Sequence, residues 1–166
     1  THELVCETPR APAREDFIAV KDGKFYLRGK PWNPVGVNYW PLYASGLDSD
    51  EYGGRWMQPR FYDPALIEED LALMRKLGMN LVSIQLGTPE EIHCLRDFMR
   101  RCGERGIWVN GFLRAASPVA FDEAGVRALI EGAGLRDSPV LFAYDTIWEA
   151  GNHLFKGPGR KSWDPE

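Results

Sequence analysis

The chain has 166 residues, about the length of one domain. Hydrophobic residues make up 44% and charged residues 27%, which excludes a disordered tail, a collagen-like fibre and a disulfide-dense mini-protein. The net charge is −4 and no basic stripe is present, which argues against nucleic acid as a partner.

The predicted elements begin after an N-terminal arm, residues 1–16, whose prolines and mixed charge indicate a segment lying on the surface. Short β-prone runs at 17–20 and 24–27 flank an Asp-Gly pair, which is typical of a tight hairpin turn. A further strand is predicted at 34–38, followed by a long aromatic loop.

Three helices are predicted from their start and stop signals. Asp63 and Pro64 supply an N-cap and a first-turn proline for one helix, and Gly78 follows its end. A capping box at 88–91 opens a second helix, and Asp122 caps a third.

Apolar runs at 80–86, 107–113 and 140–146 predict strands that alternate with these helices. Alternating strands and helices imply α/β class with a parallel sheet. The repeat of about 35 residues is similar to that of a TIM-type (β/α)8 barrel. Residues 17–155 would then form the N-terminal half of a barrel: four βα units preceded by a β-hairpin. A doubly wound open sheet is the alternative, but no glycine-rich phosphate-binding motif follows any strand.

Residues 156–166 are interpreted as a tail leading into a missing helix, because Asp164-Pro165-Glu166 repeats the helix-opening pattern of Asp63-Pro64. We therefore expect a partner that covers the open sheet edges: the C-terminal half of the barrel or a second copy of the chain.

Parallel (β/α) barrels carry their chemistry at the carboxyl ends of the strands. The polar residues near those ends include Ser83, Gln85, Asn110 and Asp145. One further carboxylate, Glu149, follows the fourth strand beside a tryptophan. A glutamate partly desolvated in this way has a raised pKa and suits a general acid.

Five segments, in a fixed order, resemble the clan A glycoside hydrolases, especially the cellulase- and mannanase-like group. They are VKDGKFYLRGKP (20–31), GVNY (36–39), DLALMRKLGMN (70–80), GIWV (106–109), and FAYD followed by WE (142–149). The resemblance covers about residues 17–155.

The resemblance implies a retaining glycosidase whose acid/base glutamate follows the fourth strand and whose nucleophile follows the seventh. Glu149 matches the acid/base by position, and the nucleophile would lie beyond residue 166. Glu149 would protonate the leaving oxygen and later deprotonate water, with its partner carboxylate ~5–5.5 Å away. No cofactor and no metal is expected.

The carbohydrate is expected to contact polar and aromatic side chains near the strand ends, because flat aromatic rings stack on sugars. For each ring the alternative is packing beneath a loop. Arg114 would pair with Glu149 or with an acidic sugar, and the alternative is a solvated charge in a loop. The candidate substrate-binding residues are Asn38, Tyr39, Trp40, Trp56, Arg114, Trp148, Asn152 and His153.

Three positions differ from the family pattern. Trp148 stands where Asn usually precedes the acid/base, Ser83 where Arg is common, and Arg114 where His often ends the third strand. Two alternatives therefore stay open: a non-catalytic carbohydrate-binding or scaffold barrel descended from the family, and a barrel enzyme acting on a phosphorylated substrate.

The cysteines and the apolar runs bear on the environment of the chain. Three cysteines cannot all pair and form no C-x-x-C motif, so we expect buried thiols. No apolar run reaches the ~18 residues of a membrane span. No charged-then-apolar leader is present, which favours the cytoplasm, although a removed leader would leave the same sequence.

Overall fold

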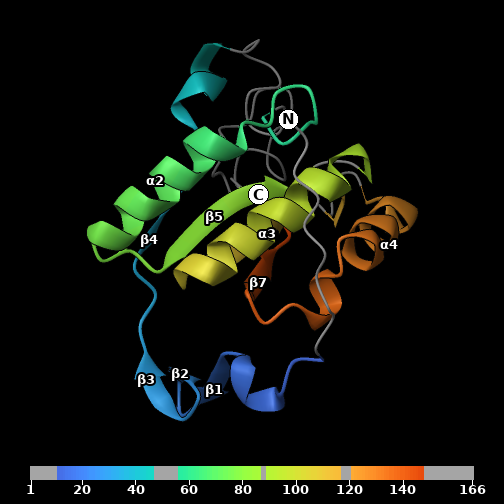
Figure 1. Cartoon of the computed structure of the whole chain (residues 1–166). Coiled ribbons are helices and arrows are strands. Elements are labelled where there is room, and N and C mark those ends of the chain that lie inside the picture. Colours follow the sequence, from blue (N-terminus) through green and yellow to red (C-terminus); the bar gives the residue numbers. More distant parts are fainter. Residues whose placement is uncertain (1–10, 47–55, 87–88, 117–120, 148–166) are drawn as a thin grey trace, which may run out of the picture.

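Figure 1 shows the chain as a computed structural model, which describes residues 11–46, 56–86, 89–116 and 121–147. Within these ranges the chain forms an antiparallel sheet of three strands, a parallel sheet of four strands and three α-helices. The predicted α/β class and the predicted parallel sheet are confirmed.

The antiparallel sheet consists of β1 (Ala19–Lys21), β2 (Lys24–Leu27) and β3 (Lys30–Trp32). Asp22 and Gly23 have φ angles of 50° and 71°, as a two-residue type I′ turn requires, so the hairpin predicted at Asp-Gly is confirmed. Arg28 and Gly29 make a second turn with φ angles of 49° and 74°. This turn adds β3, which was not among the predicted elements.

The parallel sheet follows the order of the chain. Its strands are β4 (Gly36–Asn38), β5 (Leu81–Leu86), β6 (Trp108–Leu113) and β7 (Leu141–Asp145). The helices between them are α2 (Pro64–Lys76), α3 (Ile92–Arg105) and α4 (Glu123–Gly132). The four described strands form an open sheet and do not close into a barrel.

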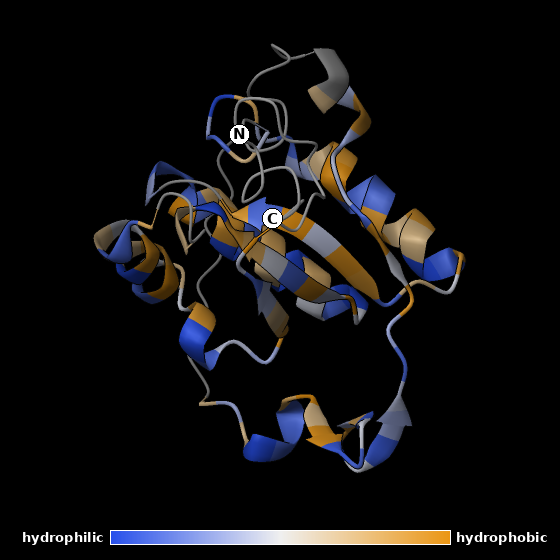
Figure 2. Ribbon diagram, turned by 180° about the vertical axis from the view of Figure 1, so that it is seen from behind, coloured by the Kyte–Doolittle hydropathy of each residue, from blue (hydrophilic) through white to orange (hydrophobic). Residues whose placement is uncertain are grey.

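The helices cover one face of this sheet. Right-handed crossovers that always step in the same direction place every helix on the same side. Helix α3 lies in front of the sheet in Figure 1, and the strands lie in front of α3 in the reverse view of Figure 2. The opposite sheet face carries none of the described helices.

The helix boundaries follow the predicted signals. Asp63 caps α2 because one carboxylate oxygen accepts hydrogen bonds from the backbone N–H groups of Ala65 and Leu66, at 3.0 and 3.1 Å. Asp122 caps α4 by accepting from the N–H of Gly125 at 3.0 Å. The predicted capping box at 88–91 falls partly outside the described residues, and its last three residues form a 3-10 turn before α3.

The core lies between the sheet and the helices. In β5, side chains that are fully or almost fully buried alternate with half-buried ones, since successive residues of a strand point to opposite faces. Val82, Ile84 and Leu86 face the helices, where they join Ile67 and Leu71 of α2 and Leu95 and Phe98 of α3.

The hairpin sheet packs at the amino ends of the parallel strands. Trp32 is buried, with its ring centroid 5.6 Å from that of Trp108 and 5.3 Å from that of Phe142. Phe25 adds a second contact to Phe142 at 5.1 Å. This aromatic cluster holds the hairpin against the sheet.

Candidate functional site

The carboxyl ends of β4 to β7 lie along one edge of the sheet because all four strands run in the same direction. Ligands of open parallel sheets and of barrels bind at this edge. The residues that end the strands are Asn38, Leu86, Leu113 and Asp145. The functional site is therefore sought on this edge and on the sheet face that the described helices leave open.

Two rows of side chains cross the open face. Asn38, Ser83, Asn110 and Ala143 are partners in register, and Gln85, Phe112 and Asp145 form the next row toward the carboxyl ends. Residues paired in register point to the same face, and β5 shows which face it is, because Val82 and Ile84 lie in the helix-side core.

The first row contains a hydrogen bond between strands. The Nδ2 group of Asn110 donates to the Oγ of Ser83 over 3.0 Å, and both side chains are half-buried. In the second row, the Asp145 carboxylate accepts from the backbone N–H of Ile147 at 3.2 Å, which turns the chain directly after β7. The rows thus combine neutral hydrogen-bonding groups and one carboxylate with two apolar side chains, Ala143 and the buried Phe112.

Asn38 lies at the last position of β4 and is exposed, as expected for a residue at a site edge. Arg114 is also exposed and begins a 3-10 turn directly after β6. Trp40 is half-buried and packs against the core cluster.

Tyr39 and Trp56 lie in the core on the helix side, away from the open face. Tyr39 is only 4% exposed, its hydroxyl donates to the Asp70 carboxylate at 2.9 Å, and its ring stacks on Phe98 with centroids 5.8 Å apart. Burial, reinforced by Asp70, raises the pKa of Tyr39 far above its usual value. Trp56 is fully buried against Tyr39 and Phe98.

These two rings have no exposed face for a sugar to stack on. The expectation that they contact carbohydrate is corrected accordingly, and they are assigned to the core. For Tyr39 the physical reason is strand alternation, because it follows Asn38 and its side chain points to the opposite side of the sheet. Trp56 is buried because its ring packs against Tyr39 and Phe98.

Four candidate residues lie outside the described residues: Trp148, Glu149, Asn152 and His153. Glu149 follows the end of β7 by four positions in the sequence. Its role stays a prediction.

From the sequence alone, four of these residues are recognisable only as polar residues near strand ends: Ser83, Gln85, Asn110 and Asp145. Their grouping into rows comes from the register of the strands. The available sequence signal is the alternation in β5, where Ser83 and Gln85 alternate with Val82, Ile84 and Leu86.

The described residues offer no obvious metal centre: no group of three or more His, Cys, Asp or Glu side chains among them is arranged to hold an ion. Cys94 and Cys102 of α3 are free, buried thiols, as expected. Burial raises the pKa of Cys94 to about 11 and raises the pKa of Cys102 well above its usual value, which makes both poor nucleophiles at neutral pH.

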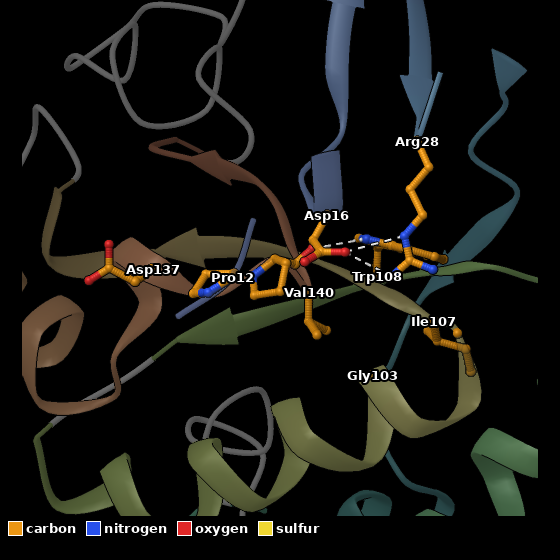
Figure 3. A pocket seen from close by; sticks show the side chains of 10 residues that line it. Pro12, Asp16, Arg28, Gly103, Ile107, Trp108, Asp137 and Val140 are labelled. Atoms are coloured by element: carbon orange, nitrogen blue, oxygen red, sulfur yellow. Dashed lines mark hydrogen bonds and ion pairs between the residues drawn. The ribbon is translucent and has the colours of Figure 1, made fainter. Parts of the chain in front are cut away.

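A cavity of about 380 Å³ lies at the other end of the sheet, between the hairpin and the amino ends of β6 and β7. Figure 3 shows Asp16 and Arg28 pointing toward one another beside Trp108, and these two side chains form an ion pair at 2.8 Å. The indole N–H of Trp108 donates to the carbonyl of Pro139 at 3.0 Å. The ion pair ties the end of the N-terminal arm to the hairpin sheet, and the indole hydrogen bond ties β6 to the segment before β7.

Comparison with known proteins gives no match to any protein-family model, to curated proteins or to solved structures. None of the helices in the described ranges has the length and apolar character that crossing a bilayer takes.

Proposed function

We propose that this chain provides the acid/base half of a retaining glycoside hydrolase site, built on the first four βα units of a TIM-type barrel. The substrate is an O-glycosidic bond of an oligo- or polysaccharide. The observation that carries the proposal is the open sheet face, where polar side chains in register lead to the strand edge that Glu149 follows in sequence.

The strand order supports the barrel part of the proposal. In a doubly wound sheet the strand order reverses and helices cover both faces. Here β4 to β7 follow the order of the chain, and the core joins α2, α3 and α4 to one face. A barrel repeats this step eight times, so four more strands are needed, from a further segment or from a second copy.

The proposed chemistry uses two carboxylates. Glu149 protonates the glycosidic oxygen as the bond to the anomeric carbon breaks, while a nucleophile from the other half forms the glycosyl-enzyme. Glu149 then removes a proton from water, which attacks the anomeric carbon and releases the sugar with retained configuration.

Replacing the acid/base tests the proposal. In the natural polypeptide that carries this sequence, Glu149→Gln should lower kcat about 10²–10⁴-fold on substrates with poor leaving groups. The kcat on aryl glycosides with good leaving groups should fall less, because their leaving oxygen departs without being protonated. Azide should restore turnover by forming a glycosyl azide. The matched control is Glu123→Gln, on the exposed side of α4.

Unchanged rates on poor leaving groups would refute the role of Glu149. A second candidate function, sugar binding without catalysis, is favoured by the neutral character of the row formed by Asn38, Ser83 and Asn110. Saturable sugar binding combined with no hydrolysis in the natural polypeptide would support that second function.

A further inference from the structure

Three polar side chains of β5 and β6 share the open face of the sheet. Ser83 and Asn110 are partners in register, and Gln85 lies two positions further along β5 on the same side. The other side of β5 is sealed, since Val82 and Ile84 are completely buried in the helix-side core. The placement of these polar groups is therefore fixed by the packing of the apolar ones.

The chain satisfies only part of the hydrogen-bonding capacity of this group. Asn110 donates to Ser83 over 3.0 Å, which uses one amide hydrogen and one hydroxyl lone pair. Among the described residues, no protein partner meets the Asn110 carbonyl oxygen or either end of the Gln85 amide. Half-buried groups of this kind reach solvent, so their free donors and acceptors can bind the hydroxyl groups of a ligand.

Polar side chains in the middle of a strand, as in β5, are also unusual for a parallel sheet. Strands covered on both faces are normally apolar on both faces. The side of β5 toward the helices carries only apolar side chains, while its other side carries a hydroxyl and an amide after Leu81. An amide, a hydroxyl and a second amide on neighbouring strands give a surface suited to a ligand with many hydroxyl groups.

The charge of the two rows indicates which kind of hydroxyl-rich ligand would bind, a neutral or an acidic one. Neutral amides donate and accept hydrogen bonds, as sugar hydroxyls do. The rows themselves hold no cationic side chain, and their one charged residue, Asp145, belongs to the same row as Gln85. Arg114, exposed directly after β6, lies beyond the second row. A carboxylate beside the platform disfavours uronic acids and sugar phosphates, because like charges repel strongly where water is partly excluded.

We infer that Ser83, Gln85 and Asn110 form a platform that binds the hydroxyl groups of an uncharged sugar unit and so selects neutral over acidic saccharides. This inference rests on the proposed function and narrows its substrate class. It also assigns Gln85 a ligand-binding role and no structural one.

Calorimetric titration of the full 166-residue chain with cellotetraose, mannotetraose and tetragalacturonate tests the inference. At least one neutral tetrasaccharide should bind at least tenfold more tightly than the uronate. Asn110→Ala and Gln85→Leu should each weaken that binding at least tenfold. The matched controls, Asn33→Ala and Gln58→Leu, replace the same residue types outside the two rows and should leave the Kd within twofold.

Thermal unfolding separates a binding role from a structural one. Gln85→Leu keeps the volume of the side chain and removes an amide without a protein partner, so its Tm should be unchanged or higher while binding is lost. A lower Tm with unchanged sugar affinity would overturn the inference. If Asn110→Ala does not fold, Ser83→Ala and Gln85→Leu carry the test.

The remaining outcomes distinguish this inference from the proposed function. Sugar binding that all platform variants retain, or equal affinity for the uronate, would overturn the platform while the carbohydrate function stands. Failure of every saccharide to bind, both to the chain and to the natural polypeptide that carries it, would overturn both.

Discussion

Two neighbouring residues at the end of β4 show how one position changes the role of a side chain. Asn38 is exposed at the strand end, whereas Tyr39 is buried and bonded to Asp70. Both residues belong to the GVNY segment that resembles the glycoside hydrolases. The resemblance alone does not separate them, but the alternation of side chains along a strand does.

A single capping residue is expected to matter for stability. Asp63 accepts two backbone N–H groups at the start of α2 that would otherwise lack partners. Asp63→Ala should lower the free energy of unfolding by about 1 kcal/mol, measured by urea denaturation. Asp63→Asn retains an accepting oxygen, so its free energy of unfolding should fall by only a small part of that amount. An equal fall for both variants would contradict the capping role.

At the scale of elements, α2 and α3 are joined by an ionic network. Arg101 of α3 donates to Asp97 at 2.7 Å and to Glu68 of α2 at 3.1 Å. Tyr62 donates to the same Asp97 carboxylate at 2.9 Å, so the loop before α2 is held as well. The network is only partly exposed to solvent and links α2 directly to α3.

The network makes stability sensitive to acid. Burial acts to raise the pKa of Asp97, but hydrogen bonds from Arg101, Arg100 and Tyr62 outweigh it and hold the pKa below its usual value. Glu68 behaves in the same way, with burial opposed by Arg105 and Arg101. Because their pKa values are lower in the folded chain, the two ionised carboxylates stabilise the fold at any pH above their unfolded-state pKa values of about 4. This stabilisation is lost as the pH falls through their folded-state pKa values.

The urea midpoint should therefore fall as the pH decreases from about 5 to 3. Asp97→Asn should cost about 1–3 kcal/mol at neutral pH, because it leaves charged donors without their carboxylate, and should flatten the pH dependence. Glu123→Gln removes an exposed i,i+4 pair with Arg127 and should cost under about 0.5 kcal/mol. An Asp97→Asn variant with the full acid dependence would assign the effect to other groups.

At the scale of the whole molecule, the described part of the chain is an open sheet with one helix-covered face. Each edge strand, β4 and β7, has one neighbour among the described strands. Exposed apolar side chains occur on or beside both: Val35 and Val37 at β4, and Tyr144 in β7. This pattern fits a sheet that is continued by further strands.

The proposed site therefore needs a second carboxylate from outside these four units. The 166-residue chain alone should not hydrolyse aryl glycosides faster than its Glu149→Gln variant, while it still binds neutral oligosaccharides. Product release measured by absorbance at several enzyme concentrations checks this. Turnover that depends on Glu149 and grows with the square of the chain concentration would show that two copies complete the site, and turnover linear in concentration would contradict the half-site proposal.

Much of the fold was predictable because its signals act over a few residues. Asp-Gly fixes the hairpin turn, Asp-Pro and Asp start helices, and apolar runs mark the strands. The turn at Arg28-Gly29 was missed because arginine seldom adopts a positive φ, and here the pairing of β2 with β3 imposes it.

The sequence by itself determined the α/β class, the order of the elements and the parallel direction of the main sheet, since each depends on local pattern and short connections. Only the tertiary structure decided which side chains share a face. Asn110 meets Ser83 across 27 positions of the chain, and Tyr39 meets Asp70 across 31. Such contacts depend on strand register and on how helices pack over the sheet, and these are set by the burial of many distant apolar residues together.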